Sequence, residues 1–481
     1  MRECLDHYVD GAWRAPLAGA RVQEVIDPAT EEVSGTVAVG GEADALRAID
    51  AAHRAFQSYG QTPLANRLDL LAAVCAVYER RLDDVADAIT AEMGAPLAVL
   101  SKPAQARMGL GHFQAALAVA RGFPFERVQG TTRILREPIG VCALITPWNW
   151  PMNQVACKVA PALATGCTTV LKPSEFAPYS ARILAEILHE AGVPAGVFNM
   201  IHAKGSTAGP LLASDPRVDM VSLTGSTAAG AAVAHAAADG IKRVSLELGG
   251  KSANIICESA DLAPAVVHAV RTMMANTGQS CNAPSRLLVP ASRLEEAEAV
   301  AAAVCARMVV GDPRRPETTI GPVANRRQYE RVVQMIERGL AEGARLVCGG
   351  PARPEGLDRG FFVRPTVLSR VTDGMAVARE EIFGPVLVIR PCTDIDDAVR
   401  SANDSVYGLS GYVTAGTLEE ARAVARRLRT GMVHLNGAGV DLMAPFGGYK
   451  QSGLGREWGA AGFEEFLETK AMMGSEALQG A

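Results

Sequence analysis

The chain has 481 residues, of which 48% are hydrophobic and 21% charged, and its formal net charge is −5. This length is too great for one ordinary core, so we expect two or three globular domains. Lysine and arginine are spread along the chain, which argues against a nucleic-acid partner. No apolar run reaches the roughly 18 to 20 residues of a membrane span, and the N-terminus lacks a signal peptide's apolar core, so we expect a cytoplasmic protein without a membrane partner.

The ten cysteines, in a chain without an export signal, favour a reducing compartment and free thiols. No C-x-x-C pair and no H-x-x-x-H pair occurs, so we expect no metal site. Cys142 and Cys257 lie in apolar, strand-like runs and are predicted to be buried. Cys281 differs, because its neighbours are Gly, Gln, Ser and Asn instead of aliphatic residues.

The first 100 residues predict a short extended start followed by helices. Thr62 and Pro63 are expected to supply the cap and the first-turn proline of one helix. The residues 121–138 alternate polar and apolar side chains and predict a hairpin outside the main domains. The helix predicted before Thr62 would form its apolar face from Leu46, Ile49, Ala52 and Phe56, which recur at helical spacing.

From residue 140 onward, short apolar runs alternate strictly with helical patterns. Short buried strands separated by helices predict an α/β fold with a parallel, doubly wound sheet. The predicted strands are 141–146, 167–171, 197–201, 220–223 and 244–248. The predicted helices are 152–164, 178–191, one through 211–212, and 226–238.

A second α/β segment follows, with helices between its predicted strands. One of these helices opens with a capping box that runs from Thr417 to Glu420. The predicted strands lie near 253–257, 286–289, 386–390, 411–414 and 432–435.

Ligands of a parallel sheet bind outside the carboxyl ends of its strands. Polar and charged residues that could contact a ligand cluster at these positions. Four predicted strands of the first sheet end in such residues, which places four motifs on one edge. These motifs are Trp148-Asn149, Lys172 with Ser174 and Glu175, Thr224-Gly225-Ser226, and Glu247.

Cys281, in the segment GQSCNAP at 278–284, is the candidate nucleophile, since a lone cysteine in a glycine-flanked turn can present a thiolate. Glu247, in the segment ELGGK at 247–251, is the candidate general base. A cysteine–histidine hydrolase is the alternative for Cys281. It would need a histidine partner, and the nearest in sequence, His268, belongs to a predicted helix.

Asn149, in the segment PWNWP at 147–151, could donate a side-chain N–H to an oxyanion, or it could simply shape a proline-rich turn. Lys172 and Glu175 suit a ribose, and a carboxylate at Glu175 favours NAD over NADP. The segment from Gly225 through Ser226 to Gly230 opens a helix, where backbone N–H groups can face a pyrophosphate.

These segments together resemble the aldehyde dehydrogenase superfamily, and the resemblance runs from about Tyr8 to Thr469. It implies a Rossmann-like domain that binds NAD without the G-x-G-x-x-G fingerprint, with NADP also possible. It implies that Cys281 is the nucleophile, Glu247 the general base and Asn149 an oxyanion donor. Lys158 and Glu457 match a pair proposed to relay protons to the base.

The resemblance also implies a set of cofactor contacts. Glu381 matches the glutamate that holds the nicotinamide ribose, and Phe383 the phenylalanine beside the ring. The full set expected to bind the cofactor is Trp148, Lys172, Ser174, Glu175, Gly225, Ser226, Gly230, Leu248, Gly249, Glu381 and Phe383.

The resemblance divides the chain into an NAD-binding domain (1–120 and 139–249), a catalytic domain (250–449) and a small β arm (121–138 and 466–476). The arm implies a homodimer or a homotetramer. The expected substrate pocket involves Trp150, Gln154, Cys157, Ser280, Asn282, Val440 and Phe446.

The family members that oxidise succinate semialdehyde carry an arginine where this chain has Cys157, which argues here for a neutral, fairly apolar aldehyde. Two alternatives remain at this point. One is a coenzyme-A-acylating relative, although such members often lack the glutamate that matches Glu247. The other is a non-catalytic structural protein that has retained the fold.

Overall fold

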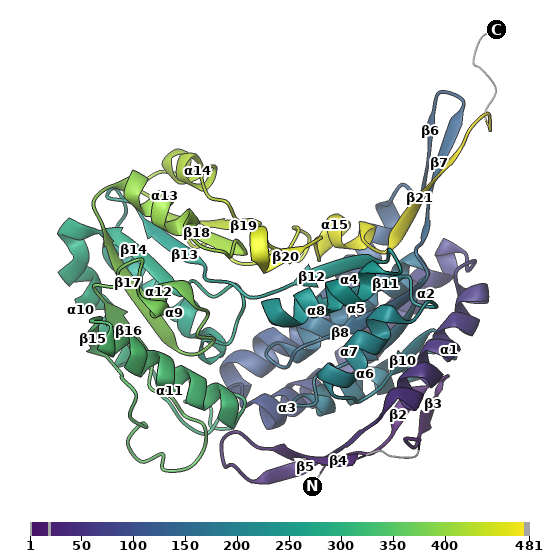
Figure 1. Ribbon diagram of the computed structural model, residues 1–481, viewed down its shortest axis with the longest axis horizontal. Helices are drawn as coiled ribbons and strands as arrows, with labels where there is room; N and C mark the ends of the chain where they lie inside the picture. Colours follow the sequence, from purple (N-terminus) through teal and green to yellow (C-terminus); the bar gives the residue numbers. More distant parts are fainter. Residues whose placement is uncertain (1, 18–20, 476–481) are drawn as a thin grey trace.

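An eight-stranded sheet organises one lobe of the molecule, drawn at the right of Figure 1. Its five central strands run parallel, and the added strands at both edges are antiparallel. The computed structural model describes residues 2–17 and 21–475. In sheet order the strands are β20 (Gly453–Leu454), β12 (Arg243–Glu247), β11 (Met220–Thr224), β8 (Val141–Ile145), β9 (Thr168–Lys172), β10 (Phe198–Met200), β2 (His7–Val9) and β3 (Ala12–Arg14).

Helices cover both faces of this sheet, because its central strands are apolar on both sides. Along β8, Leu144 packs into one helical layer while Ala143 and Ile145 pack into the other. One layer holds α2 (Leu64–Arg80), α4 (Ala106–Gly122), α5 (Pro151–Thr165) and α6 (Pro178–Glu190), and the other holds α1 (Glu42–Tyr59), α7 (Gly205–Ser214) and α8 (Thr227–Ala238). Helices α3 (Leu82–Met93) and η1 (Leu97–Gln105) pack beside the first layer.

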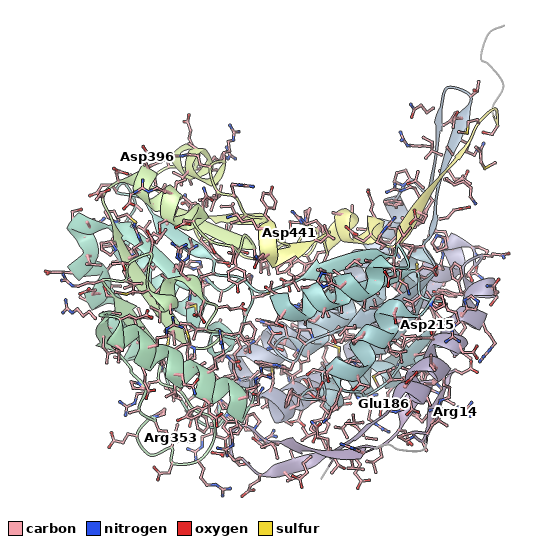
Figure 2. The ribbon with its side chains drawn as sticks, viewed as in Figure 1. Arg14, Glu186, Asp215, Arg353, Asp396 and Asp441 are labelled. Atoms are coloured by element: carbon pink, nitrogen blue, oxygen red, sulfur yellow. The ribbon has the colours of Figure 1, made fainter. Side chains whose placement is uncertain are left out.

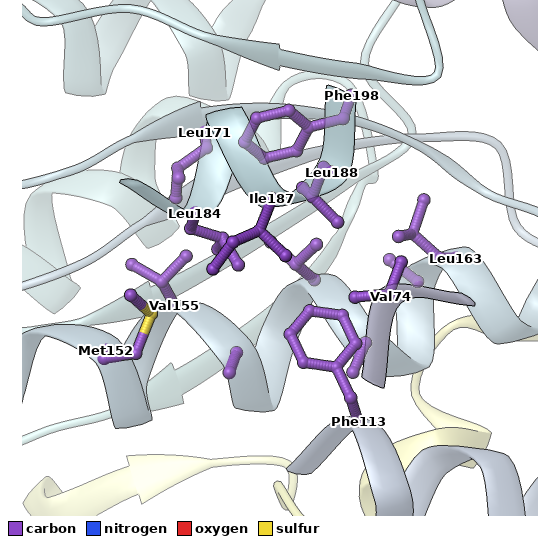
Figure 3. Close-up of a cluster of buried hydrophobic side chains, with 14 of the residues drawn as sticks. Val74, Phe113, Met152, Val155, Leu163, Leu171, Leu184, Ile187, Leu188 and Phe198 are labelled. Atoms are coloured by element: carbon purple, nitrogen blue, oxygen red, sulfur yellow. The ribbon is translucent and has the colours of Figure 1, made fainter. Parts of the chain in front are cut away.

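Figure 3 shows the heart of the first layer, where Phe113 of α4, Leu163 of α5 and Leu171 of β9 pack together with α6. These three side chains are fully buried. The layer contains α5, whose N-terminal end carries residues of the candidate site, so this core fixes the position of that helix.

A seven-stranded sheet organises the other lobe, and only its edge strand β15 is antiparallel. In sheet order the strands are β15 (Arg345–Cys348), β16 (Thr366–Ser369), β17 (Val386–Cys392), β14 (Arg286–Pro290), β13 (Ala253–Ile256), β18 (Ser410–Thr414) and β19 (Met432–Leu435). Its helices are α9 (Leu262–Met274), α10 (Leu294–Cys305), α11 (Arg326–Ala341), α12 (Ala376–Arg379), α13 (Ile395–Asn403) and α14 (Leu418–Ala425). The predicted alternation of strand and helix is confirmed in both lobes.

A three-stranded antiparallel arm projects from the body, as Figure 1 shows at the upper right. Its hairpin consists of β6 (Glu126–Gln129) and β7 (Thr132–Pro138), and β21 (Leu467–Met472) pairs with β7. The hairpin predicted within 121–138 is therefore present, although α4 continues to Gly122. Residue 476 of the expected arm, like residues 1 and 18–20 of the expected first domain, lies outside the described residues.

The prediction for the N-terminal residues, a short extended start followed by helices, was incomplete. The first 39 residues contribute β2 and β3 to the large sheet, and they also form a separate three-stranded sheet. Helix α2 begins at Leu64, so Pro63 takes the cap position itself and Thr62 makes no cap hydrogen bond. The strands of the separate sheet, in order, are β1 (Arg2–Cys4), β5 (Val33–Val39) and β4 (Arg21–Ile26).

Charged side chains are distributed over the outer surface of the molecule. Figure 2 labels Arg14 on β3 and Arg353 near the opposite end of the molecule, which agrees with the even spread of basic residues along the chain. Across residues 2–17 and 21–475, no helix is both long enough and apolar enough to cross a membrane.

Truncation of Leu163 to Ala should lower the free energy of unfolding by about 2–5 kcal/mol, because it leaves a cavity in the layer that holds α5. The matched control Val22→Ala, at a side chain 64% exposed, should cost less than about 0.5 kcal/mol. Urea unfolding followed by circular dichroism measures both values. Equal losses in the two variants would contradict the assignment of this core.

Candidate functional site

The candidate site is a cavity of about 580 Å³ whose lining comes from both lobes. The carboxyl ends of β8, β11 and β12 supply one wall, and segments of the seven-stranded lobe supply the other. The predicted site residues that line it are Trp148, Asn149, Gly225, Ser226, Glu247, Gly249, Cys281, Glu381 and Phe383. The structure thus brings together residues from five separate segments of the chain.

Other lining residues were not singled out from the sequence as site residues. Several of them are ordinary surface types on α11 and the turn before it, and no local motif distinguishes them. They are Pro147, Phe176, Thr227, Ala228, Asn325, Arg327, Gln328, Arg331 and Tyr407.

Seven of the predicted catalytic and cofactor-binding residues, and all seven residues of the expected substrate pocket, lie outside this lining. Lys172 forms an ion pair with Glu175, with 3.1 Å between Nζ and Oε2, and Ser174 lies between them in the chain. Gly230 lies inside α8, where Leu248 packs directly against it. Lys158 and Glu457 are buried behind the cavity wall.

The backbone before Cys281 adopts an unusual conformation. Asn276, Thr277 and Gly278 in η2 (Ala275–Gly278) all have positive φ angles, 54°, 55° and 69°. L-residues other than glycine rarely adopt this region, and a threonine there is strained. A Cβ atom at Gly278 would collide with the backbone carbonyl of Gly384, so only glycine fits that position.

The side chain of Asn276 holds this turn in place. Its Nδ2 donates to the backbone oxygen of Asn149 at 2.8 Å and to that of Gln279 at 3.1 Å, and its Oδ1 accepts from Gln105 at 3.1 Å. All of these groups are buried, so the hydrogen bonds are made away from water. Asn276 therefore links η1, the loop after β8 and the turn that leads to Cys281.

Asn149 is buried at the cavity wall, and its Nδ2 donates to the backbone oxygen of Gln279 at 2.9 Å. An amide nitrogen carries two N–H groups, so one remains for a ligand oxygen. The hydrogen bond to Gln279 fixes the rotamer of Asn149 next to the turn that carries Cys281.

Glu247 is buried at the end of β12 and lines the cavity. Burial first, and then the nearby Glu457 carboxylate, raises the pKa of Glu247 well above its usual range. Neither of its oxygens makes a hydrogen bond of ordinary geometry to a described residue. The Cys281 thiol is nonetheless close enough to lower this pKa in part. A buried carboxyl with a raised pKa is suited to proton transfer.

The electrostatics of Cys281 differ from the sequence-based expectation. A nucleophilic thiol was expected beside cationic groups that lower its pKa. Here burial, followed by the carboxylates of Glu247 and Glu381, raises the pKa of Cys281 well above the usual cysteine value. The thiol is therefore protonated in this state, and Glu247 is the neighbour able to take its proton.

Lys158 and Glu457 form a buried ion pair behind the site. Lys158 also donates to the hydroxyl oxygen of Ser222 at 3.0 Å, and the Cys157 thiol lies 3.5 Å from the second oxygen of Glu457. Burial lowers the pKa of Lys158, but Glu457, together with Cys157 and Glu247, raises it overall, so the lysine stays charged. Glu457 in turn acts on the pKa of Glu247, which couples the pair to the site.

Glu381 reaches across from the second lobe. Its Oε1 accepts from the backbone N–H of Gly250 at 3.0 Å, and a side chain at Gly249 would collide with it. Burial raises the pKa of Glu381 to about 7, while the Gly250 N–H lowers it in part. Trp148 and Phe383 meet edge to face at 5.6 Å between ring centroids. These contacts join the segment of Glu381 and Phe383 to Trp148 and to Gly249–Gly250 on the other side of the cavity.

The start of α8 offers fewer free donors than expected. The Gly225 N–H donates to the Glu247 backbone oxygen, and the Gly230 N–H donates within the helix to that of Ser226. The Ser226 hydroxyl caps the helix by accepting from Ala229 at 3.2 Å. The amides of Ser226, Thr227 and Ala228, at the helix start, remain to face an anion.

A second, apolar wall adjoins Cys281. A cluster of buried side chains there is formed by Cys157, Leu409, Phe446 and Trp458, and half-buried Met108, Cys281, Met432 and Leu442 pack against it. Trp150 is close by, since its Nε1 donates to the Ser280 hydroxyl at 2.7 Å. Val440 is 49% exposed and is not part of the cluster. In the described part of the chain, no group of His, Cys, Asp and Glu side chains could hold a metal ion.

Comparisons with known proteins agree on one family. Residues 13–472 match the model of the aldehyde dehydrogenase family. The chain is 59% identical over 476 residues to a 3-succinoylsemialdehyde-pyridine dehydrogenase from a Pseudomonas species, covering 99% of this chain and 100% of the relative.

Solved structures are similar over nearly the whole chain. One is a mutant of aldehyde dehydrogenase C from Pseudomonas syringae, in complex with NAD+ and octanal. It has a TM-score of 0.97 and 49% identity, and the match covers 98% of this chain and 97% of that chain. Another is an aldehyde dehydrogenase from Mycobacterium tuberculosis in complex with NAD+, with a TM-score of 0.95, 38% identity and 98% coverage of both chains.

Alkylation of Cys281 by iodoacetamide should accelerate with pH through a midpoint above the ordinary cysteine value of 9.0, because the thiolate is the reactive form. In Glu247→Gln, which removes a carboxylate that raises this pKa, the midpoint should fall. Mass spectrometry of the peptide that contains Cys281 measures the rate. The control Glu258→Gln, at an exposed carboxylate, should not move the midpoint. A midpoint well below 9.0 in the unaltered protein would contradict this electrostatic assignment.

Proposed function

This chain belongs to the aldehyde dehydrogenase family, and on that premise we propose that it oxidises a neutral, fairly apolar aldehyde to the carboxylic acid with NAD+. One observation carries the proposal: Cys281, Glu247 and Asn149 line a single cavity between the two sheets. A thiol, a carboxyl group and an amide donor are the set that thioester chemistry on an aldehyde needs.

In the first half-reaction, Glu247 takes the thiol proton and the Cys281 sulfur adds to the aldehyde carbon. The oxygen of this thiohemiacetal becomes an anion, and the second N–H of Asn149 and the backbone N–H of Cys281 stabilise it. Bound NAD+ supplies the acceptor for the hydride that leaves the carbon. Cys281 then holds the acyl group as a thioester.

Before the second half-reaction, Glu247 releases the proton that it took from the thiol. It then accepts a proton from water as the water attacks the thioester carbon. The carbon–sulfur bond breaks, the carboxylic acid leaves, and the Cys281 sulfur leaves as a thiolate that takes the proton back from Glu247, which restores the thiol. The burial that raises the pKa of Glu247 makes it a stronger base than an exposed glutamate. Lys158 and Glu457 adjust the charge around Glu247, and we propose that they relay its proton outward.

The residues present suit a dinucleotide. The cavity has an apolar pair, Trp148 and Phe383, near Cys281, and the start of α8 with its free amides. Glu381 is a half-buried carboxylate that can accept from ribose hydroxyls, and Leu248 and Gly249 join β12 to Gly250, whose N–H it accepts. A ribose beside Lys172, Ser174 and Glu175 would meet one cation and one carboxylate. The carboxylate disfavours a 2′-phosphate and supports NAD over NADP, with use of both still open.

The cluster next to Cys281 supports an apolar substrate. Its side chains are aliphatic, aromatic or sulfur-containing, and Cys157 stands where an arginine would bind a distal carboxylate. The relatives named above act on a pyridine semialdehyde or bind octanal, which are both neutral and largely apolar. An uncharged aldehyde with an alkyl or aromatic tail fits this wall.

We further propose that the eight-stranded lobe (1–120 and 139–249) binds the dinucleotide and that residues 250–449 form the catalytic domain. The arm, 121–138 with 466–476, would join copies of the chain into a homodimer or a homotetramer, because no other strand among residues 2–17 and 21–475 pairs with the outer edges of β6 and β21. The ten free cysteines support a reducing, cytoplasmic location.

A coenzyme-A-acylating enzyme remains the main alternative, and accumulation of a thioester in place of the acid would identify it. A non-catalytic role of the fold is disfavoured, because all of the proposed catalytic groups are present at one cavity.

Glu247→Gln should still form one equivalent of NADH, because loss of the carboxylate lowers the pKa of Cys281 and lets the thiol ionise without this base. It should then turn over about 10²- to 10⁴-fold more slowly, because hydrolysis of the thioester lacks its base. Cys281→Ala should give no NADH. Stopped-flow absorbance with octanal measures both phases, and Glu258→Gln serves as the matched control. Steady-state turnover of Glu247→Gln at the unaltered rate would remove Glu247 from its role.

The hydrolytic step should accelerate with pH through a pKa above the usual glutamate range, because Glu247 acts only when deprotonated. Glu457→Gln removes a charge that raises this pKa and leaves Lys158, which lowers it, so the midpoint should move to lower pH. Single-turnover decay of the acyl-enzyme across pH measures the midpoint. An upward shift would contradict the proposed coupling.

A further inference from the structure

A second cavity, of about 550 Å³, lies beside the turn that leads to Cys281, since Ala275 and Asn276 are part of its wall. Most of the remaining wall comes from η1 in one lobe and from α9 and the end of α10 in the other. The linings of this cavity and of the candidate site share no described residue, so the two are separate. A volume of this size suits a small organic ligand.

Most of the side chains that line this second cavity are apolar. Met274 and Ile320 are buried in its wall, whereas Val99, Val267 and Met308 remain partly exposed. Covering exposed apolar surface with hydrocarbon is favourable by about 25 cal/mol per Å². A ligand with an apolar tail would therefore gain free energy by binding here.

Two arginines give the same cavity a positive charge. Arg271 lies in the last turn of α9, and Arg307 follows α10 by two residues. Both line the cavity, and both are exposed. Among residues 2–17 and 21–475, neither side chain forms an ion pair or a hydrogen bond, and no aspartate or glutamate lines the cavity. Both guanidinium groups are therefore available to an anion from outside, and a carboxylate matches their paired N–H groups.

Two segments of unusual backbone bound this cavity. One is η1, a π-helix of nine residues, and the other is η2, which contains the left-handed turn. π-helical turns are rare and occur frequently at functional sites. Gln105, the last residue of η1, donates to Asn276 Oδ1 at 3.1 Å, so the two segments are joined directly. A ligand in this cavity would contact the elements that fix the turn before Cys281.

The apolar lining and the unpaired guanidinium groups restrict what can occupy the cavity. A small inorganic anion would leave the apolar wall exposed to water, and a plain hydrocarbon would leave the two arginines without a partner. A carboxylate that carries an apolar tail satisfies both parts of the lining.

We propose that this cavity binds the anion of a carboxylic acid with an apolar tail, with the carboxylate at Arg271 and Arg307 and the tail against Val267 and Met274. The product of the proposed reaction belongs to this chemical class. The cavity is then a second place where the enzyme holds its own product, apart from Cys281. The identification of the occupant as product rests on the proposed function, whereas the binding itself does not.

Isothermal titration calorimetry with octanoate, the acid that corresponds to octanal, tests this site. The unaltered protein should bind one octanoate per chain here, in addition to any octanoate bound near Cys281. Arg271→Gln combined with Arg307→Gln should weaken binding at this site at least about 10-fold, because the charge-assisted hydrogen bonds to the carboxylate are lost. The matched control combines Arg422→Gln with Arg429→Gln, two exposed arginines outside this lining, and should bind octanoate like the unaltered protein.

Two further ligands separate the contributions of the tail and the charge. Butanoate, which is four methylene groups shorter, should bind at least about 10-fold more weakly than octanoate. 1-Octanol keeps the tail without the charge, so its affinity should be the same in the unaltered protein and in the variant that lacks both arginines. Octanoate binding that is unchanged in that variant, or equal affinity for octanoate and butanoate, would overturn the proposal.

The two proposals fail differently. NADH formation from octanal without arginine-dependent binding of octanoate would contradict only the second site. Arginine-dependent binding of octanoate without NADH formation from any aldehyde would contradict only the proposed function.

Discussion

The left-handed turn at Asn276, Thr277 and Gly278 is the constraint on which the site depends. Such a conformation is costly for a threonine and is maintained because the buried Asn276 amide bonds to two backbone oxygens and to Gln105. The turn directs the chain so that Cys281 faces the cavity, and the same amide fixes the loop that carries Asn149. The relative position of the thiol and the amide donor thus arises from one buried polar network. The hydrogen bonds of that network offset the conformational strain of the turn.

Around this turn, the charges are arranged to keep the resting site nearly neutral. Burial raises the pKa of both Glu247 and Cys281, and the Glu247 carboxylate raises that of Cys281 further, whereas the Cys281 thiol lowers that of Glu247 in part. Lys158 is a nearby cation, but Glu457 neutralises it. In a site of this kind, the sulfur becomes a nucleophile when its proton passes to the carboxyl group. We expect this transfer to occur when a substrate and a cofactor are bound.

Much of this arrangement could be predicted from the sequence. The alternation of apolar strands and helices predicted the five parallel strands of the first sheet and five of the seven strands of the second, but not β15 and β16. The order of strand ends placed Asn149 and Glu247 on one edge. The short N-terminal strands were missed because they are only 3 to 7 residues long and several of their side chains are exposed. The raised pKa of Cys281 and the wall of the second cavity depend on groups that are far apart in the chain. Such long-range packing leaves no local pattern to read.

The most direct test of the central claim is a crystal structure of Glu247→Gln after exposure to NAD+ and octanal. The account predicts an acyl group bonded to the Cys281 sulfur, with its carbonyl oxygen within hydrogen-bond distance of the Asn149 side-chain nitrogen. An acyl group on any other residue, or a Cys281 sulfur turned away from the cavity and unmodified, would contradict it.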